Sequence, residues 1–300
     1  MLVKSLGFIR NNHLGIVQLA TSEQDTFDYI TASKAIQEGW LVIKEVGQDG
    51  DVNRLLVINE SDKFVFLMDG DILSGAKQNR VVNTSILLAP HVKTNIPVSC
   101  VERGRWRFVS DKFGGTDYTA PLGLRHMKTG QVTSNLRAQR GHQAYQGDIW
   151  NYVSQSEERN QFKSRSSNLS DVFEHRRREI DSLAHSFPLQ EQANGMAVFI
   201  GKMLVGVDLY NRMSVFAEYF PRIIRSLALE QAPQTIDEDL QEAEAKFKTD
   251  EFMDEVLACE KESFPGAGVG SERRFQFKTV QGTLLDYEAH MIHLTAIKKF

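Results

Sequence analysis

Two stretches of sequence decide how the chain folds. Residues 69–80 read DGDILSGAKQNR, and residues 97–106 read PVSCVERGRW. Both lie among short runs of β-prone residues, yet they concentrate glycines, amides, guanidinium groups, carboxylates and a thiol. The core of a sheet has no use for that chemistry, because polar groups are costly to bury without partners. Some of these groups are therefore expected to face a ligand.

The runs around these two stretches are extended and closely spaced. They cover residues 41–46, 54–59, 64–68, 81–88 and 96–102. Turn residues such as Gly47 and Gly70 separate them. Strands this close in sequence favour antiparallel pairing. A helix of about two turns is expected before them, capped by Thr31 or Ser33 and ended by Gly39.

Helical periodicity dominates the later part of the chain. Helices are predicted within residues 148–187, 213–228 and 236–262, a hairpin within 196–209 and strands at 274–279 and 284–297. Pro221 is expected to kink the second of these helices or to divide it. Residues 108–147 are rich in Gly, Thr, Gln and Ser, and they predict irregular structure or a lid.

These elements predict an α+β fold. An antiparallel sheet, which could close toward a sandwich or a barrel, would combine strands of the N-terminal half with the C-terminal strands, and helices of the second half would cover it. We expect a single domain over residues 1–300. The alternative is a division into a β-rich, motif-bearing part at 1–147 and a helix-rich part at 148–300.

Composition narrows the class of partner. The chain has 35 Lys and Arg against 39 Asp and Glu, a net charge of −4, with the two signs interspersed. A surface built mainly for nucleic acid is therefore not expected, although a local basic groove is allowed. The two cysteines, Cys100 and Cys259, are far apart and predict reduced thiols in the cytoplasm. No run has the length of a membrane helix or a signal-peptide core, so no membrane partner is expected.

Cys100 and Glu102 are the candidate catalytic residues. Strand alternation places them with Val98 on one face. Cys100 could be a nucleophile if a cation lowered its pKa, but a lone cysteine on such a strand is more often a small core residue. Glu102 needs a partner, and Arg80 and Arg105 are the natural ones. A catalytic acid or base and a buried ion pair remain equal alternatives.

The candidate ligand-binding residues surround this pair. Lys77, Gln78, Asn79, Arg80 and Arg105 offer ammonium, amide and guanidinium groups that suit a phosphate or carboxylate. The alternative is that they fix a turn. The spacing does not match a phosphate-binding P-loop.

Two further residues complete the predicted ligand-binding set. Trp106 could stack on a planar ring, although an isolated tryptophan is more often packing. Arg137 belongs to a polar central stretch that could converge on an anion. No metal site is predicted, because His290 and His293 would point to opposite faces of a strand. The cofactor is left open, and a homo-oligomer is possible.

At these motifs the chain resembles the bacterial family of the ARG and rhodanese-phosphatase superfamily associated protein domain. The resemblance rests on residues 71–80, 83–87 and 96–106, and it continues at 134–137, 148–150 and 206–209. The family name implies an association with ADP-ribosylglycohydrolase-type and phosphatase-type proteins. It therefore implies a role in handling ADP-ribose or related phosphorylated nucleotides, and it supplies no catalytic residues.

The expected function is binding or processing of a phosphorylated, nucleotide-like ligand. As an enzyme, the protein would be a hydrolase or transferase with Glu102 as acid or base and Arg80 and Arg105 as anion clamps. The competing hypothesis is a non-catalytic module that binds a ligand or fixes an assembly.

Overall fold

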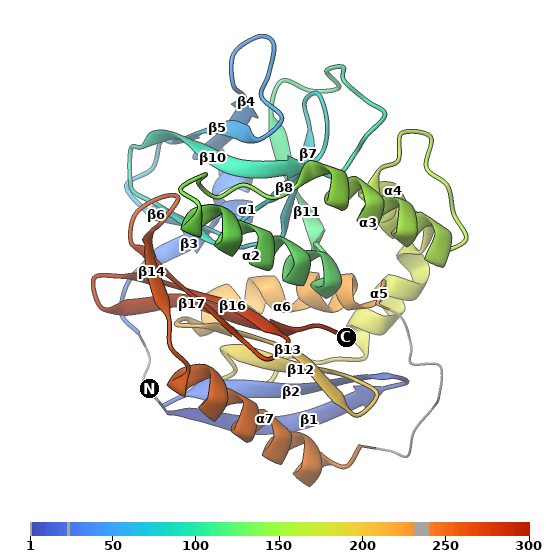
Figure 1. Cartoon of the computed structure of the whole chain (residues 1–300), viewed down its shortest axis with the longest axis vertical. Helices are drawn as coiled ribbons and strands as arrows, with labels where there is room; N and C mark the ends of the chain where they lie inside the picture. The colour runs from blue at the N-terminus through green and yellow to red at the C-terminus, as the bar shows by residue number, and fades with distance from the viewer. Residues whose placement is uncertain (1, 23–24, 231–239) are drawn as a thin grey trace.

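A large antiparallel sheet forms the lower half of the molecule in the view of Figure 1. The computed structural model describes residues 2–22, 25–230 and 240–300. The sheet has eight strands in the order β1-β2-β12-β13-β17-β16-β15-β14. Their bounds are β1 Val3–Asn11, β2 Leu14–Thr21, β12 Gly195–Ile200, β13 Met203–Tyr210, β14 Glu262–Pro265, β15 Ser271–Phe277, β16 Val280–Tyr287 and β17 His290–Lys298.

Two smaller sheets lie above the large one in Figure 1. We call their strands the motif strands, because residues 69–80 and 97–106 lie among them or follow directly. One has six strands in the order β11-β7-β8-β10-β5-β4, and the other is β3-β6-β9, in which β3 and β6 are parallel. Their bounds are β3 Tyr29–Thr31, β4 Leu41–Glu45, β5 Arg54–Asn59, β6 Phe64–Leu67, β7 Asp71–Gly75, β8 Arg80–Val82, β9 Ile86–Leu88, β10 Lys93–Cys100 and β11 Phe113–Thr119.

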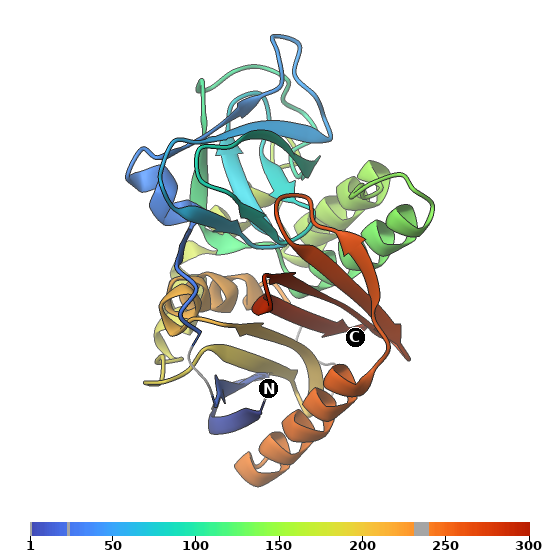
Figure 2. The same ribbon diagram turned by 90° about the vertical axis from the view of Figure 1, so that its left-hand side faces the viewer.

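Helices fill the space between the sheets and cover the outside. They are α1 Ala32–Gln37, α2 Leu122–Arg137, α3 Gln146–Arg159, α4 Leu169–His175, α5 Arg177–His185, α6 Met213–Leu227 and α7 Glu242–Ala258. The helices α2 and α6 lie between the eight-stranded sheet and the motif strands, whereas α7 lies on the outer face of the large sheet, as the two views show (Figures 1 and 2).

The large sheet is buried on both faces, which explains its continuous apolar runs. In β2, Ile16 packs into the inner core with Phe216 of α6, whereas its neighbour Val17 packs into the outer core with Met253 and Val256 of α7. Successive strand residues point to opposite faces, so one strand supplies two cores.

The predicted α+β class with antiparallel sheets is confirmed. The C-terminal strands do not join the motif strands, however. They pair with β13, so they share a sheet with the N-terminal pair β1 and β2. His290 and His293 of β17 point to different partners, Asp25 and Asp208, as the strand alternation predicts.

The prediction of irregular structure at residues 108–147 is wrong over much of its length, because this region contains strand β11 and helix α2. Helix α2 shows no apolar stripe, since many of its buried positions are polar. They include Arg125, Lys128, Thr129, Thr133 and Asn135. Periodicity detects a helix only when its buried face is apolar.

Other predicted helices differ in detail. Thr31 caps α1 by accepting a hydrogen bond from the Lys34 N–H, and Gly39 follows with a φ of +73°, both as predicted. The helix expected over 169–187 is two helices, α4 and α5, that meet at Arg176. Helix α6 continues through Pro221 without being divided. Residues 236–239 of the third expected helix lie outside the described residues.

A layer of buried charges joins the two halves of the molecule through α2. The Arg125 guanidinium donates to both carboxylate oxygens of Asp208 on β13, at 2.8 and 2.7 Å. One turn later, Lys128 Nζ donates to Asp69 Oδ1 at 2.7 Å. All four side chains are about 1% exposed or less. Arg125 thus binds α2 to the large sheet, and Lys128 binds it to the motif strands.

The Asp208 carboxyl shows how strongly this layer depends on pairing. Burial raises its pKa, but the opposing charge and hydrogen bonds of Arg125 outweigh burial and hold the pKa well below its usual range. The carboxylate is therefore ionised at neutral pH.

We predict that Asp208→Asn destabilises the fold by about 3–5 kcal/mol, because it removes the bidentate counter-charge of the buried Arg125 and leaves only Asp69 at 3.6 Å, which Lys128 already uses. Urea denaturation measures this loss. The matched control is Glu262→Gln, which breaks the half-exposed pair between Arg137 and Glu262 and should cost less than about 1 kcal/mol. Equal losses in the two variants would contradict the role given to Asp208.

Candidate functional site

The motif residues gather where β7, β8 and β10 lie side by side. Arg80 opposes Cys100 in the antiparallel register of β8 and β10, so the two stretches of sequence meet. Residues 76–79 form the connection between β7 and β8, and the segment 103–112 folds back over this connection. The two stretches therefore lie side by side, but the Arg80 and Glu102 side chains are buried, at 0% and 3% exposed.

Glu102 forms a bidentate ion pair with Arg105. Arg105 Nε donates to Glu102 Oε1 at 2.8 Å, and Nη2 donates to Oε2 at 2.6 Å. The same carboxylate accepts hydrogen bonds from the Asn79 N–H at 3.1 Å and from Ser166 Oγ at 2.9 Å. Each oxygen thus has two donors. Of the two alternatives for Glu102, this geometry favours the structural ion pair over a general acid or base.

Arg80 is the member of the set with unused donors. Its side chain is fully buried; Nη1 donates to the Gln78 carbonyl at 2.9 Å, and Nη2 lies 3.5 Å from Glu45 Oε1. Within the described residues, Nε and Nη2 have no hydrogen-bond acceptor. The guanidinium lies 5.6 Å from the centre of the Trp106 ring, which covers it. A buried donor without an acceptor costs free energy, so this group calls for a partner.

Lys77 fastens the neighbouring loop and supports two aromatic rings. Its Nζ donates to the carbonyls of Gln48 and Asp49, each at 2.7 Å. The same ammonium lies 5.3 Å from the Trp106 ring centre and 5.1 Å from that of Phe108. The Lys77 ammonium is therefore already hydrogen-bonded within the protein. It would act on a ligand only indirectly, by holding the Trp106 and Phe108 rings in place.

The two amides of the motif hold backbone segments together. Asn79 Oδ1 accepts from the Gly75 N–H at 3.0 Å, and its Nδ2 donates to Asn168 and Ser170. Gln78 Nε2 donates to the Arg103 carbonyl at 3.3 Å. For both residues the alternative of fixing a turn is the better supported one.

Cys100 lies in an environment that suppresses its reactivity. Its side chain is fully buried, and burial raises the pKa of the thiol to about 11, against the opposing effect of the Arg80 charge. Gln146 bridges the Cys100 backbone, accepting from its N–H at 2.8 Å and donating to its carbonyl at 2.7 Å. The thiolate is the nucleophilic form, so Cys100 behaves as a core residue.

Arg137 is not brought into this cluster. It lies in the last turn of α2 and forms a half-exposed ion pair with Glu262 of β14, on the eight-stranded sheet. The sequence grouped it with the motif because residues 108–147 gave no periodicity, and the helix that carries it was missed. Its expected place in the ligand site is not supported by the structure.

The sequence analysis also missed a serine, histidine and aspartate in series. Ser85 Oγ lies 2.9 Å from His293 Nδ1, and His293 Nε2 lies 3.2 Å from Asp208 Oδ1. The order resembles a nucleophilic relay. All three side chains are at most 2% exposed, however, and both Asp208 oxygens are held by Arg125. The series therefore ties β17 to the motif strands. No local sequence signal brings together residues so far apart.

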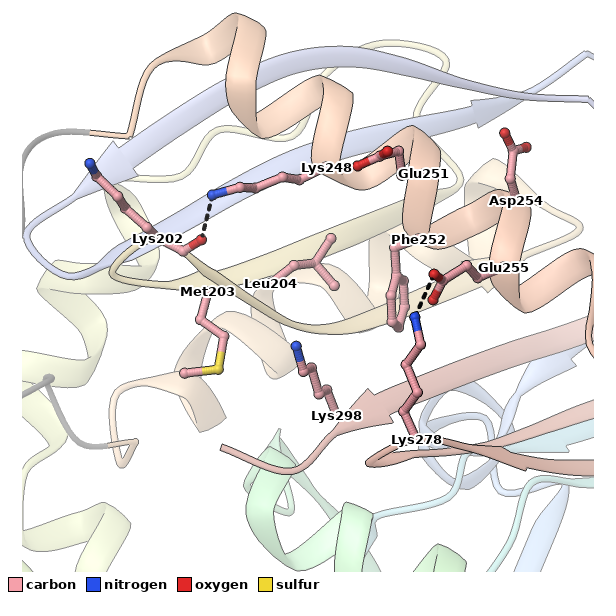
Figure 3. A pocket seen from close by; sticks show the side chains of 10 residues that line it. All are labelled: Lys202, Met203, Leu204, Lys248, Glu251, Phe252, Asp254, Glu255, Lys278 and Lys298. Atoms are coloured by element: carbon pink, nitrogen blue, oxygen red, sulfur yellow. Dashed lines mark hydrogen bonds and ion pairs between the residues drawn. The ribbon is translucent and has the colours of Figure 1, made fainter.

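A hollow of about 590 Å³ lies at the other end of the molecule, between α7 and the ends of β13 and β17 (Figure 3). Its polar lining is mixed. Lys278 pairs with Glu255 at 2.7 Å, and Lys248 donates to the Lys202 carbonyl at 3.2 Å. Lys298 extends into the hollow (Figure 3). Exposed, mutually paired lysines and glutamates are typical of a solvated surface.

The comparisons with known proteins identify the family. The model of the ARG and Rhodanese-Phosphatase-superfamily-associated Protein domain matches residues 4–297. The chain therefore belongs to this family, and the match covers the motif strands, α2 and the large sheet alike. Neither a curated protein nor a solved structure matches the chain. Over the described ranges, we find no helix with the length and apolar character needed to span a bilayer.

We predict that iodoacetamide labels Cys259 much faster than Cys100 in the native protein. At pH 8 only about one Cys100 thiol in a thousand is ionised, and the side chain is buried, whereas Cys259 is partly exposed. Mass spectrometry of the tryptic peptides measures both rates. Unfolding in urea should bring the two rates together, and similar labelling in the native state would contradict the burial of Cys100.

Glu230 is another buried group with a shifted pKa. It accepts a hydrogen bond from the Gly123 N–H at 3.2 Å, in the first turn of α2. Burial raises its pKa to about 7, against the opposing effects of this N–H and the Arg159 charge, with Tyr152 and His13 as further neighbours. Its neutral form is therefore favoured in the folded state.

This shift predicts a pH dependence of stability. Because the folded pKa is raised, the Glu230 contribution is fully present below about pH 4.5 and is lost as the pH rises to about 7, a change of about 3 kcal/mol. Glu230→Gln removes it, so the stability of the variant relative to the unmodified protein should rise across this window. Urea denaturation at several pH values tests this. A constant difference between the two proteins would contradict the shift.

Proposed function

We propose that the protein binds a phosphorylated, nucleotide-like ligand, of which ADP-ribose is one example, at Arg80 and Trp106, and that it does so without catalysing a reaction there. The observation that carries the proposal is the buried Arg80 guanidinium beneath a tryptophan ring that is 47% exposed: in the described part of the chain its Nε has no acceptor, and its Nη2 has only the 3.5 Å ion pair with Glu45. Guanidinium groups match the oxygens of a phosphate, and an indole ring stacks on a planar base.

The charge of the cluster supports an anionic ligand. Its cations are Lys77, Arg80 and Arg105, and its carboxylates are Glu45 and Glu102, so three positive charges face two negative ones. Charges in such a partly desolvated place need to be balanced. A phosphate that reached Arg80 would supply both the missing charge and the missing acceptors. The Trp106 ring would have to shift about its side-chain torsions to admit the phosphate, while the backbone of residues 103–112 stays in place.

The same geometry favours binding over catalysis. Glu102 has four hydrogen bonds, one of which comes from the Asn79 N–H in the connection between β7 and β8. Cys100 is protonated at neutral pH and buried. A general acid or base needs an oxygen that is free for the substrate, and a nucleophilic cysteine needs its thiolate form, so neither group is suited to catalysis.

Two further observations are consistent with this proposal. The family description associates these domains with ARG and rhodanese-phosphatase superfamily proteins, and a phosphatase acts on a phosphorylated substrate. Cys100 and Cys259 are both free thiols, which supports the cytoplasm, a reducing compartment, as the place where the protein acts.

We predict that Trp106→Ala weakens ligand binding by about tenfold while the melting temperature stays near that of the unmodified protein. The probes are ADP-ribose, AMP, NAD and cyclic nucleotides, screened by thermal shift and then measured by calorimetry. Trp40→Ala is the matched control, because Trp40 is 37% exposed and lies between α1 and β4. Arg80 is a poorer test, since its replacement would also disturb the core.

The proposal fails if none of these compounds raises the melting temperature. It also fails if Trp40→Ala weakens binding as much as Trp106→Ala does, because the effect would then not belong to the site.

A further inference from the structure

The segment 103–112, which reads RGRWRFVSDK, presents apolar side chains to solvent from a fixed backbone. Trp106, Phe108 and Val109 are 47%, 52% and 59% exposed. Adjacent exposed apolar side chains usually mark a binding surface. We call the segment the aromatic strip.

The backbone of the aromatic strip is tied down at several points. The Val109 N–H donates to the Ala76 carbonyl at 3.1 Å, and Ser110 Oγ accepts from the Ala76 N–H at 2.9 Å. Arg105 Nη1 donates to the same Ala76 carbonyl at 2.6 Å and to the Arg107 carbonyl at 3.1 Å. The rings are therefore held at the surface and are not tips of a loose loop, which lowers the entropic cost of binding.

The two rings form adjacent platforms. The Lys77 ammonium lies within 5.3 Å of both ring centres, so Trp106 and Phe108 share one supporting cation. In single-stranded nucleic acids, neighbouring bases stack on adjacent aromatic side chains, and this stacking does not depend on the nucleotide sequence. A mononucleotide has one base and would use one ring. Two adjacent platforms therefore indicate a ligand with more than one base.

The charge of the aromatic strip points to a polyanion. It contains Arg103, Arg105, Arg107 and Lys112 against Asp111, a local excess of three positive charges in a chain whose net charge is −4. Arg105 is used by Glu102, whereas Arg103, Arg107 and Lys112 are exposed. Basic residues that alternate with aromatic ones match a phosphate backbone with its bases.

We infer that the aromatic strip binds single-stranded nucleic acid, with successive bases on Trp106 and Phe108 and the intervening phosphates on Arg103, Arg107 and Lys112. This inference rests on the proposed function and names its ligand class. Duplexes are disfavoured because their base faces are covered. A membrane is disfavoured because Arg107 lies between Trp106 and Phe108 in the sequence, so insertion of this backbone into lipid would bring its charge toward the hydrocarbon region.

The test is fluorescence anisotropy with labelled single strands of about 12 nucleotides, both DNA and RNA, against the matching duplex. AMP, ADP-ribose and vesicles containing an anionic lipid are measured alongside. The single strand should bind at least about tenfold more tightly than AMP and the duplex. The slope of log affinity against log salt should be about −2, as expected for three phosphate contacts.

Phe108→Ala separates the inference from the proposed function. It should weaken single-strand binding by about tenfold and change AMP binding by less than about twofold, because a mononucleotide uses Trp106. Phe247→Ala is the matched control, since Phe247 is 62% exposed on α7. It should change neither affinity.

The outcomes distinguish the two claims. If AMP or ADP-ribose binds in a Trp106-dependent manner and the single strand binds no more tightly, the inference is overturned and the proposed function stands. If no nucleotide or single strand binds, both are overturned. Binding of the vesicles that is lost in Phe108→Ala, without binding of the single strand, would identify a membrane surface and also overturn the inference.

Discussion

The paired charges on α2 are the constraint on which the structure depends. Arg125 holds Asp208 of the large sheet, and one turn later Lys128 holds Asp69 beside the motif strands. Each charge is buried, so none can be left without its partner except at a cost of several kcal/mol. These pairs therefore help to fix how the large sheet lies against the motif strands, and thus where β7, β8 and β10 present the motif residues.

This constraint explains which parts of the fold could be predicted from the sequence. The motif strands and the hairpin around Gly201 were predictable because their signals are local: alternation, turn residues and a glycine that adopts positive φ. Helix α2 was not, because its buried positions carry charges and hydroxyls whose partners are up to 170 residues away. The sheet to which the C-terminal strands belong is likewise a long-range property.

The candidate site, like the fold, could be predicted from the sequence only in part. The composition of residues 69–80 and 97–106 correctly indicated that their polar groups meet, and the pairing of Glu102 with an arginine was foreseen. The sequence could not choose between Arg80 and Arg105 as that partner, because the choice depends on how residues 103–105 turn after β10 ends. It also could not place Arg137, whose position depends on the unrecognised helix.

Because Glu102 pairs with Arg105, Arg80 lacks a close carboxylate partner, and this is the basis of the ligand-binding role proposed for it. Glu102 is neutralised by a bidentate pair three residues away, so Arg80 is left with the more distant Glu45 at 3.5 Å and with donors that the described chain does not satisfy. Arg105 thus holds the backbone of the two stretches together, whereas Arg80 is poorly paired under the exposed Trp106 ring. The α2 charge layer also holds buried atoms without a hydrogen-bond partner among the described residues, such as Arg125 Nε, so what sets Arg80 apart is its place under the exposed Trp106 ring.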